Sequence, residues 1–181
     1  MNKKIITISR EFGSGGRYLG EKLAEKLGWD YYDKEIIAKV AEKTGLSQKY
    51  IEQAGEYAPS QNIFAYAFVG RNHTGASLGD YMYAAQREII LEAAEKSACV
   101  MVGRCADYIL KDRKDCLNVF ICGNTEEKVK RIMDLYKFSG KEAEKLIKET
   151  DKKRSVNYNY YTEQEWGKAV CIGCLFILYF I

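Results

Sequence analysis

The feature that most constrains the fold is the passage from a β-branched run to a cluster of glycines near the start of the chain. Residues 4–9 read KIITIS, typical of a buried strand, and REFGSGG follows before a helical pattern begins. Gly13, Gly15 and Gly16 leave backbone N–H groups uncovered, and the next helix directs partial positive charge to the same place. This layout predicts a phosphate-binding loop, although a tight turn for close packing would use the same residues.

The rest of the chain alternates strand-like and helical patterns. Further strands are expected at 29–33, 99–103 and 116–122. Helices are expected at 18–27, from about Ile36 to Gly45, at 46–55, from Asp80 to about Lys96, at 125–136 and from Ser139 to about Thr150. The expected N-caps are Ser47, Asp80 and Asn124, with a capping box in Ser139-x-x-Glu142. Alternating strands and helices predict an α/β fold with a mainly parallel sheet, whose ligands bind beyond the carboxyl ends of the strands.

Composition narrows the class of protein. The chain has 181 residues, enough for one domain, and its net charge of +3 does not favour nucleic-acid binding. Six cysteines are scattered and no secretory signal pattern is visible, so free thiols and a cytoplasmic location are expected. Cys171-x-x-Cys174 is a single pair without a nearby histidine, so no metal site is expected.

Four arginines suggest what the glycine loop binds. Arg17, Arg87, Arg104 and Arg154 fall near the ends of expected elements or in a basic segment. Phosphoryl transfer depends on positioning and on neutralising charge, and the planar guanidinium binds phosphate oxygens in pairs. Asp33 and Asp151 are candidates for orienting an acceptor, holding an arginine, or binding magnesium through water. Each arginine taken singly also fits a solvated surface charge.

Two segments depart from the alternation. Residues 56–79 contain Pro59 and His73, the only proline and histidine, and are expected to be mobile and partly helical at 63–68. Residues 170–181 form an apolar tail that is too short to span a membrane. The tail has three interpretations: a final core strand, an aberrant terminus, or a strand that docks on a membrane surface or a partner.

Four stretches resemble the cytidylate-kinase-like family of P-loop nucleoside monophosphate kinases. They are ITISREFGSGGRYLGEKLAEKLGWDYYDKEII, the Gln86–Arg87 pair, VGRCADYIL from Val102, and DKKRSVNYNYYTEQEWG from Asp151. The resemblance runs from about Lys4 to Gly167. It implies a three-layer α/β/α P-loop fold with a parallel sheet in one domain over residues 1–169. Within that domain it implies a mobile monophosphate-binding segment at 56–79 and a lid at 148–166.

The resemblance also implies a function and the roles of individual residues. The expected reaction moves the γ-phosphoryl group of ATP, with Mg²⁺, to a nucleoside monophosphate, CMP or dCMP. The loop residues expected to cradle the ATP phosphates are Gly13, Ser14, Gly15 and Gly16. The residues expected to bind the acceptor are Asp33, Arg87 and Arg104, and the catalytic lid pair is Asp151 and Arg154. Side chains in 56–79 would select the base: Tyr57, Gln61, Asn62, Tyr66, Arg71 and Asn72. The expected partners are small nucleotides.

The glycine loop differs from that of a true cytidylate kinase. A cytidylate kinase reads Gly-x-x-Gly-x-Gly-Lys-[Ser/Thr] where this chain begins with Arg10 and has Gly16 at the lysine position. The hydroxyl that would hold magnesium is missing, and Tyr18 is a poor magnesium ligand. Arg17 is expected to act as the lysine surrogate, although one residue turns its direction by about 100° around a helix. A second hypothesis is therefore a catalytically weak or inactive nucleotide- or phosphate-binding protein that retains the kinase fold.

Overall fold

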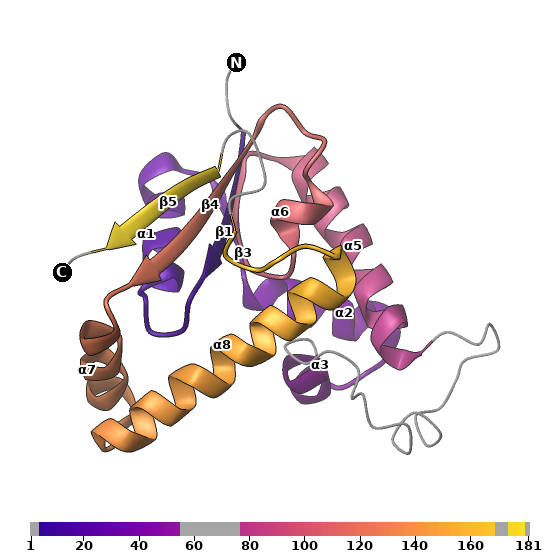
Figure 1. Ribbon diagram of the computed structural model, residues 1–181. Coiled ribbons are helices and arrows are strands. Elements are labelled where there is room, and N and C mark those ends of the chain that lie inside the picture. The colour runs from indigo at the N-terminus through magenta and orange to yellow at the C-terminus, as the bar shows by residue number, and fades with distance from the viewer. Residues whose placement is uncertain (1–3, 55–76, 169–173, 180–181) are drawn as a thin grey trace.

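The computed structural model describes residues 4–54 and 77–168, together with the backbone of residues 174–179. Figure 1 shows its strands and helices. The strands are β1 (Ile5–Arg10), β2 (Asp30–Tyr32), β3 (Cys99–Val102), β4 (Cys116–Gly123) and β5 (Cys174–Tyr179). The helices are α1 (Gly16–Leu27), α2 (Lys34–Thr44), α3 (Gln48–Ala54), α5 (Leu78–Lys96), α6 (Ala106–Ile109), α7 (Thr125–Tyr136) and α8 (Gly140–Thr162).

The strands form one parallel sheet in the order β2-β3-β1-β4-β5, with β1 in the middle. Ile5 pairs with Cys99 on one side and with Cys116 on the other, which sets the register of the central strands. Because all the pairings are parallel, the carboxyl ends of the strands meet at one edge of the sheet. The segments that follow β1, β2, β3 and β4 therefore start from the same edge.

Helices cover both faces of the sheet. Alternate residues of β1 and β3 face α1, where Ile8 and Val102 join one buried apolar cluster. The intervening residues, such as Ile5 and Met101, face a second cluster built mainly from α2, α3, α5 and α6. The strands are apolar on both faces, as expected for a parallel sheet between helix layers. The predicted three-layer α/β/α architecture is confirmed.

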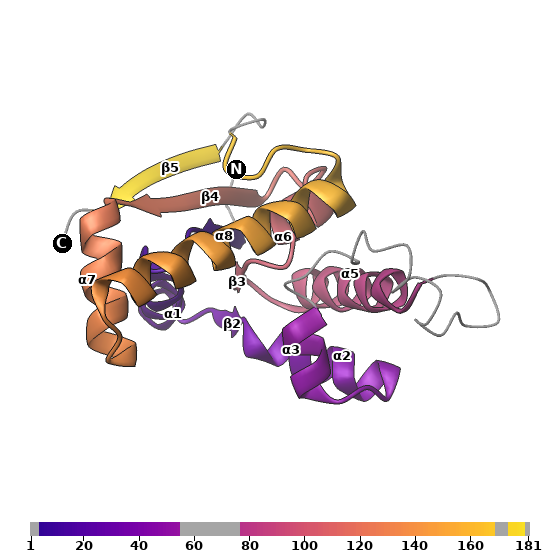
Figure 2. The ribbon, with the colours of Figure 1, turned by 60° about the horizontal axis from the view of Figure 1, so that its bottom comes forward.

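The long helix α8 links distant parts of the fold. Beside α7 it forms a small apolar cluster in which Ile132 and Ile147 are buried and Phe12 packs against them. From there it runs past the glycine loop to α5, as the two views show (Figures 1 and 2). At its far end, the rings of Tyr161 and Tyr83 on α5 stack with their centroids 4.1 Å apart. This path carries the side chains of α8 across the carboxyl edge of the sheet.

Most element predictions from the sequence are confirmed, with two corrections. Asn124 and Ser139 cap their helices as expected. The cap of α5 is Ser77 rather than Asp80, which instead occupies the third helical position of a capping box. The last helix continues to Thr162 instead of ending near Thr150. Residues 151–161 contain no glycine or proline to end it, so much of the expected lid is the C-terminal half of α8.

The two atypical segments are described only in part. Residues 77–79 of the expected insert belong to the start of α5, whereas residues 55–76 lie outside the described residues. The predicted helix at 63–68 and the predicted base-selecting side chains fall among residues 55–76. In the apolar tail, residues 174–179 form β5, which pairs in parallel with β4 at the edge of the sheet. Among the described residues, no helix is long and apolar enough to cross a membrane.

Candidate functional site

The glycine loop between β1 and α1 has the backbone of an anion-binding turn. Gly13 and Gly15 have φ angles of 80° and 83°, in the left-handed region that favours glycine. The Ser14 side chain is buried, and its hydroxyl donates to the Glu11 carbonyl at 2.8 Å, which folds the loop on itself. The loop leads directly into α1, and the first turn of a helix presents N–H groups without intrahelical acceptors.

Helix α8 fastens the loop from one side. The carboxylate of Asp151 accepts a hydrogen bond from the Phe12 amide at 2.6 Å. Nη1 of Arg154 donates to the Arg10 carbonyl at 3.3 Å and lies 3.8 Å from Oδ1 of Asp151. The pair predicted to form the lid therefore binds the loop backbone on both sides of Glu11.

Helix α7 contributes two further cations that sequence reasoning missed. The buried Lys128 places Nζ 2.9 Å from Oε2 of Glu11, an atom that also accepts from the Gly123 amide at 3.1 Å. Arg131 donates to the carbonyl of Gly13. The sequence could have indicated that Lys128 faces the protein interior. It lies four residues before the buried Ile132 and therefore on the same face of the helix.

The turn that follows β3, residues 103–105, is strained and lies at the same carboxyl edge of the sheet. Gly103, Arg104 and Cys105 have consecutive positive φ angles of 73°, 60° and 55°. For the two residues that are not glycine this conformation costs energy, and it persists only where neighbours enforce it. The buried Gln86 of α5 is one such neighbour, because its Nε2 donates to the Arg104 carbonyl at 2.9 Å.

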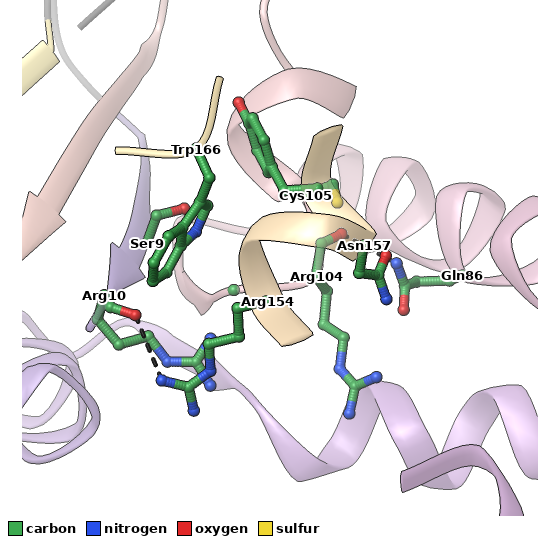
Figure 3. Close-up of a pocket in the computed structure, with 10 residues that line it drawn as sticks. Ser9, Arg10, Gln86, Arg104, Cys105, Arg154, Asn157 and Trp166 are labelled. Carbon is green, nitrogen blue, oxygen red and sulfur yellow. Dashed lines mark hydrogen bonds between the residues drawn. The ribbon is translucent and has the colours of Figure 1, made fainter. Parts of the chain in front are cut away.

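These elements line an open pocket (Figure 3). Three arginines line it: Arg10 from the end of β1, Arg104 from the strained turn and Arg154 from α8. Asn157, Tyr158 and Trp166 contribute polar and aromatic groups. Among the described residues that line the pocket there is no carboxylate, so the cavity is strongly cationic. Such a pocket suits a phosphate group.

A buried carboxylate supports the pocket from behind. Asp107 accepts a hydrogen bond from the Tyr158 hydroxyl at 2.7 Å and a long one from Ser9 at 3.5 Å. Burial raises the pKa of this carboxyl above its usual 3.8, and the hydrogen bond from Tyr158 opposes the rise only in part. Asp107 thus holds two of the pocket's polar side chains in place.

A second, smaller cavity adjoins the first, since Gln86 and Asn157 line both. Val40, Ile51 and Met82 supply its apolar surface, and further lining residues include Tyr83 and Tyr161. Burial raises the pKa of Tyr83 to about 12, so its hydroxyl stays protonated at neutral pH. A cationic compartment beside an apolar one matches an organic phosphate.

The remaining predicted residues lie around this site rather than in it. Arg17 forms an ion pair with the buried Asp33 through its Nε, and 54% of its side chain is exposed. This pairing draws Arg17 toward the end of β2. Arg87 is exposed on α5 and does not line the arginine pocket, whereas Arg104 and Arg154 both do. Arg10 lines the pocket, although sequence reasoning had not singled it out.

The described residues contain no preformed cluster of metal ligands. No group of three His, Cys, Asp or Glu side chains in the described part of the chain could hold a metal. Of the nearby carboxylates, Glu11 pairs with Lys128 and Asp33 with Arg17. The hydroxyl of Ser14 donates to the loop backbone. Mg²⁺ carried on the phosphates of a nucleotide needs no such cluster.

Comparison with known proteins gives one family match and several solved structures of similar fold. A model described as the cytidylate kinase-like family matches residues 5–170. A crystal structure of an uncharacterized protein from Eubacterium ventriosum is 30% identical, covers 97% of this chain and 88% of its own, and has a TM-score of 0.70. TT1252 from Thermus thermophilus is 14% identical with a TM-score of 0.52, over 98% and 90% of the chains. Shikimate kinase from Bacteroides thetaiotaomicron is 20% identical with a TM-score of 0.48, over 86% and 81%. No curated protein matches.

Proposed function

The chain belongs to the cytidylate kinase-like family, and we propose that it transfers the γ-phosphoryl group of ATP to a nucleoside monophosphate, CMP or dCMP. One observation carries the proposal: Arg10, Arg104 and Arg154 line a single pocket at the carboxyl edge of the sheet, beside the glycine loop. Phosphoryl transfer needs little covalent help from a protein. It needs two anionic substrates held in line, with their charge neutralised.

The residues divide between donor and acceptor. The loop backbone from Gly13 to Gly16 would bind the ATP phosphates at the start of α1. Arg104, fixed by Gln86, would bind the acceptor phosphate. Arg154 contacts the loop backbone and also lines the pocket, so it lies between the two sites. We propose that its guanidinium stabilises the negative charge that develops on the phosphoryl group during transfer.

The reaction needs no separate general base. An ionised phosphate oxygen of the acceptor forms the new bond to the γ-phosphorus, and the bond from that phosphorus to the bridging oxygen of ADP breaks. The products are ADP and a nucleoside diphosphate. Mg²⁺ would enter on the ATP phosphates, where it neutralises charge, and no step here is assigned to a protein-bound ion.

The cavity beside the arginine pocket favours the proposal that the acceptor is an organic phosphate rather than inorganic phosphate. Its apolar wall suits a base or sugar, and the side chains of Gln86, Asn157 and Tyr83 offer hydrogen bonds to an exocyclic group. Asp33 and Arg17 lie at the end of β2, and we assign them to orienting the acceptor. The proposal that the acceptor carries a pyrimidine base rests on the family relationship alone.

A panel assay tests the proposal. Purified protein would be incubated with MgATP and each common ribo- and deoxyribonucleoside monophosphate, and diphosphate products would be separated by chromatography. We expect turnover with CMP or dCMP, lost in Arg154→Gln and retained in Lys152→Gln. Lys152 is the matched control because it lies two residues away on α8 and is exposed. Absence of diphosphate product with every monophosphate would refute catalysis.

One observation favours a second function, binding without turnover. Gly16 stands at the position where a true cytidylate kinase has its lysine. A protein that only binds nucleotides would show a higher Tm in the presence of ATP or CMP, yet form no product in the panel assay. The two functions are therefore separated by the same set of samples.

A further inference from the structure

The two departures in the glycine loop, an arginine at its entry and a glycine at its exit, are sterically linked. A true cytidylate kinase has glycine where this chain has Arg10, and lysine where it has Gly16. A Cβ placed on Gly16 would lie 2.7 Å from Cβ and 3.1 Å from Cγ of Arg10. Cβ atoms do not approach that closely, so a side chain at position 16 is incompatible with Arg10 as it lies here. The loop has room for one long side chain between these positions, and Arg10 is that side chain.

The guanidinium of Arg10 crosses the end of the neighbouring strand. A Cβ placed on Gly103 would lie 2.1 Å from Nη1 and 3.1 Å from Cζ of Arg10, so the head group rests against that glycine. The positive charges of Arg17 and Arg10 both lower the pKa of Tyr31, which burial raises overall, so Arg10 also lies within electrostatic reach of β2. Its side chain thus extends from the phosphate loop toward the acceptor side of the site.

The side chain of Arg10 lies close to that of another cation, Arg154. In Figure 3 the side chains of Arg10 and Arg154 reach the same side of the arginine pocket, and Arg154 hydrogen bonds to the Arg10 carbonyl. Arg104 lines the same pocket. Like charges gathered in a partly enclosed site repel each other, and a polyanion bound among them relieves that repulsion.

We propose that Arg10 supplies the positive charge that the missing loop lysine would supply, by contacting the terminal phosphate of a bound nucleoside triphosphate. The assignment rests on the proposed function for the identity of the ligand. Other cations near the loop have partners of their own: Arg17 is held by Asp33 and is directed to the end of β2. Lys128 pairs with Glu11, and Arg131 donates to the Gly13 carbonyl. Compared with a true cytidylate kinase, this chain has its loop cation at position 10 instead of position 16, and a glycine at position 16 instead of position 10.

Binding measurements without an acceptor test this assignment. The affinities for MgATP and MgADP would be measured by calorimetry for the wild type, Arg10→Gln and Lys22→Gln. We expect the wild type to prefer ATP over ADP, and Arg10→Gln to bind ATP about 10- to 100-fold more weakly and to lose that preference. Lys22→Gln removes the same charge from an exposed position on α1 and should bind both nucleotides as the wild type does.

A second variant moves the arginine without deleting it. Gly103→Ala places a methyl group where the Arg10 guanidinium lies, so it should reproduce the loss of ATP preference. Alanine at a φ of 73° is also strained, so folding would be checked by circular dichroism. If Gly103→Ala does not fold, Arg10→Gln still decides the question.

Three results would overturn the assignment: an unchanged ATP preference in Arg10→Gln, an equal loss of ATP and ADP affinity, or no nucleotide binding by the wild type. An equal loss would indicate that Arg10 only supports the loop. These results are independent of turnover. If no monophosphate is phosphorylated but Arg10→Gln loses its ATP preference, the transfer reaction fails and the Arg10 assignment stands.

Discussion

The carboxylate of Asp151 accepts a hydrogen bond from the Phe12 amide at 2.6 Å, so helix α8 is attached directly to the phosphate loop. The cations Lys128 and Arg154 lie 3.9 and 3.8 Å from the same carboxylate. Burial nevertheless raises the pKa of Asp151 above its usual value. The loop is therefore held by a partly buried contact between Asp151 and Phe12, in which the hydrogen bond is the main stabilising interaction.

Asp151→Ala should destabilise the protein, because it removes the acceptor for the Phe12 amide. Loss of one partly buried hydrogen bond costs about 1–3 kcal/mol. Asp151→Asn keeps an acceptor oxygen and should cost less. Urea unfolding at pH 7 measures both, with Asp134→Ala on the exposed face of α7 as the control. Equal midpoints for wild type and Asp151→Ala would show that the contact contributes nothing.

The ion pair between Glu11 and Lys128 should contribute to stability, because the lysine is buried beneath the loop. Lys128→Met would remove the cation from Glu11 and leave it the hydrogen bond from the Gly123 amide. We expect a loss of about 2–3 kcal/mol, below the range for a fully buried pair because Glu11 is partly exposed.

A double-mutant cycle isolates this pair from other losses. Glu11→Gln, Lys128→Met and the double variant would be compared with the wild type by urea unfolding. We expect a coupling energy of roughly 1–2 kcal/mol. Strictly additive losses would mean that the two side chains are neighbours without a stabilising interaction.

Much of the fold could be predicted from the sequence because its signals are local. The β-branched runs, the caps at Asn124 and Ser139 and the glycine loop all depend on residues near one another in the chain. The end of α8 was misplaced because the basic, tyrosine-rich stretch suggested a break. Its tyrosines instead pack on other elements, as Tyr158 does on Asp107 and Tyr161 on Tyr83.

The site was predictable only in part because its cations come from separate elements. Arg104 and Arg154 could be placed by their positions after a strand and in a family motif. Arg10 could not, since its role depends on the contact with Gly103 across two paired strands. The structure also gives Arg17 a partner, Asp33, sixteen positions away in the chain. Such pairings follow from strand order rather than from local sequence.

Asp107→Asn should stabilise the protein at neutral pH. A carboxyl whose folded pKa is raised by burial stabilises the fold below about pH 3.8, and that contribution is lost as the pH rises through the folded pKa. Asparagine avoids the cost of burying the charge and keeps an acceptor for the Tyr158 hydroxyl. Thermal unfolding between pH 7 and pH 4 measures the difference, which should narrow as the pH falls. A variant less stable than the wild type at pH 7 would contradict the burial argument.

Gln86→Met should weaken acceptor binding without altering ATP binding, because Gln86 fixes the strained turn that carries Arg104. Loss of this hydrogen bond should raise the Kd for CMP about 10-fold. Trp166 lines the pocket, so its fluorescence in a Trp29→Phe background reports binding directly. Gln48→Met, on the exposed surface of α3, is the control. Equal CMP affinities in both variants would show that Arg104 needs no support from Gln86.

The most direct test of the account is a single-turnover experiment with ATP labelled in its γ-phosphate and protein in excess. In the presence of CMP, the label should move to CDP in the wild type. Arg154→Gln should transfer it at least about 100-fold more slowly, as expected when a group that stabilises developing charge is removed. Label that stays on bound ATP, or that transfers equally fast in Arg154→Gln, would contradict phosphoryl transfer in the arginine pocket.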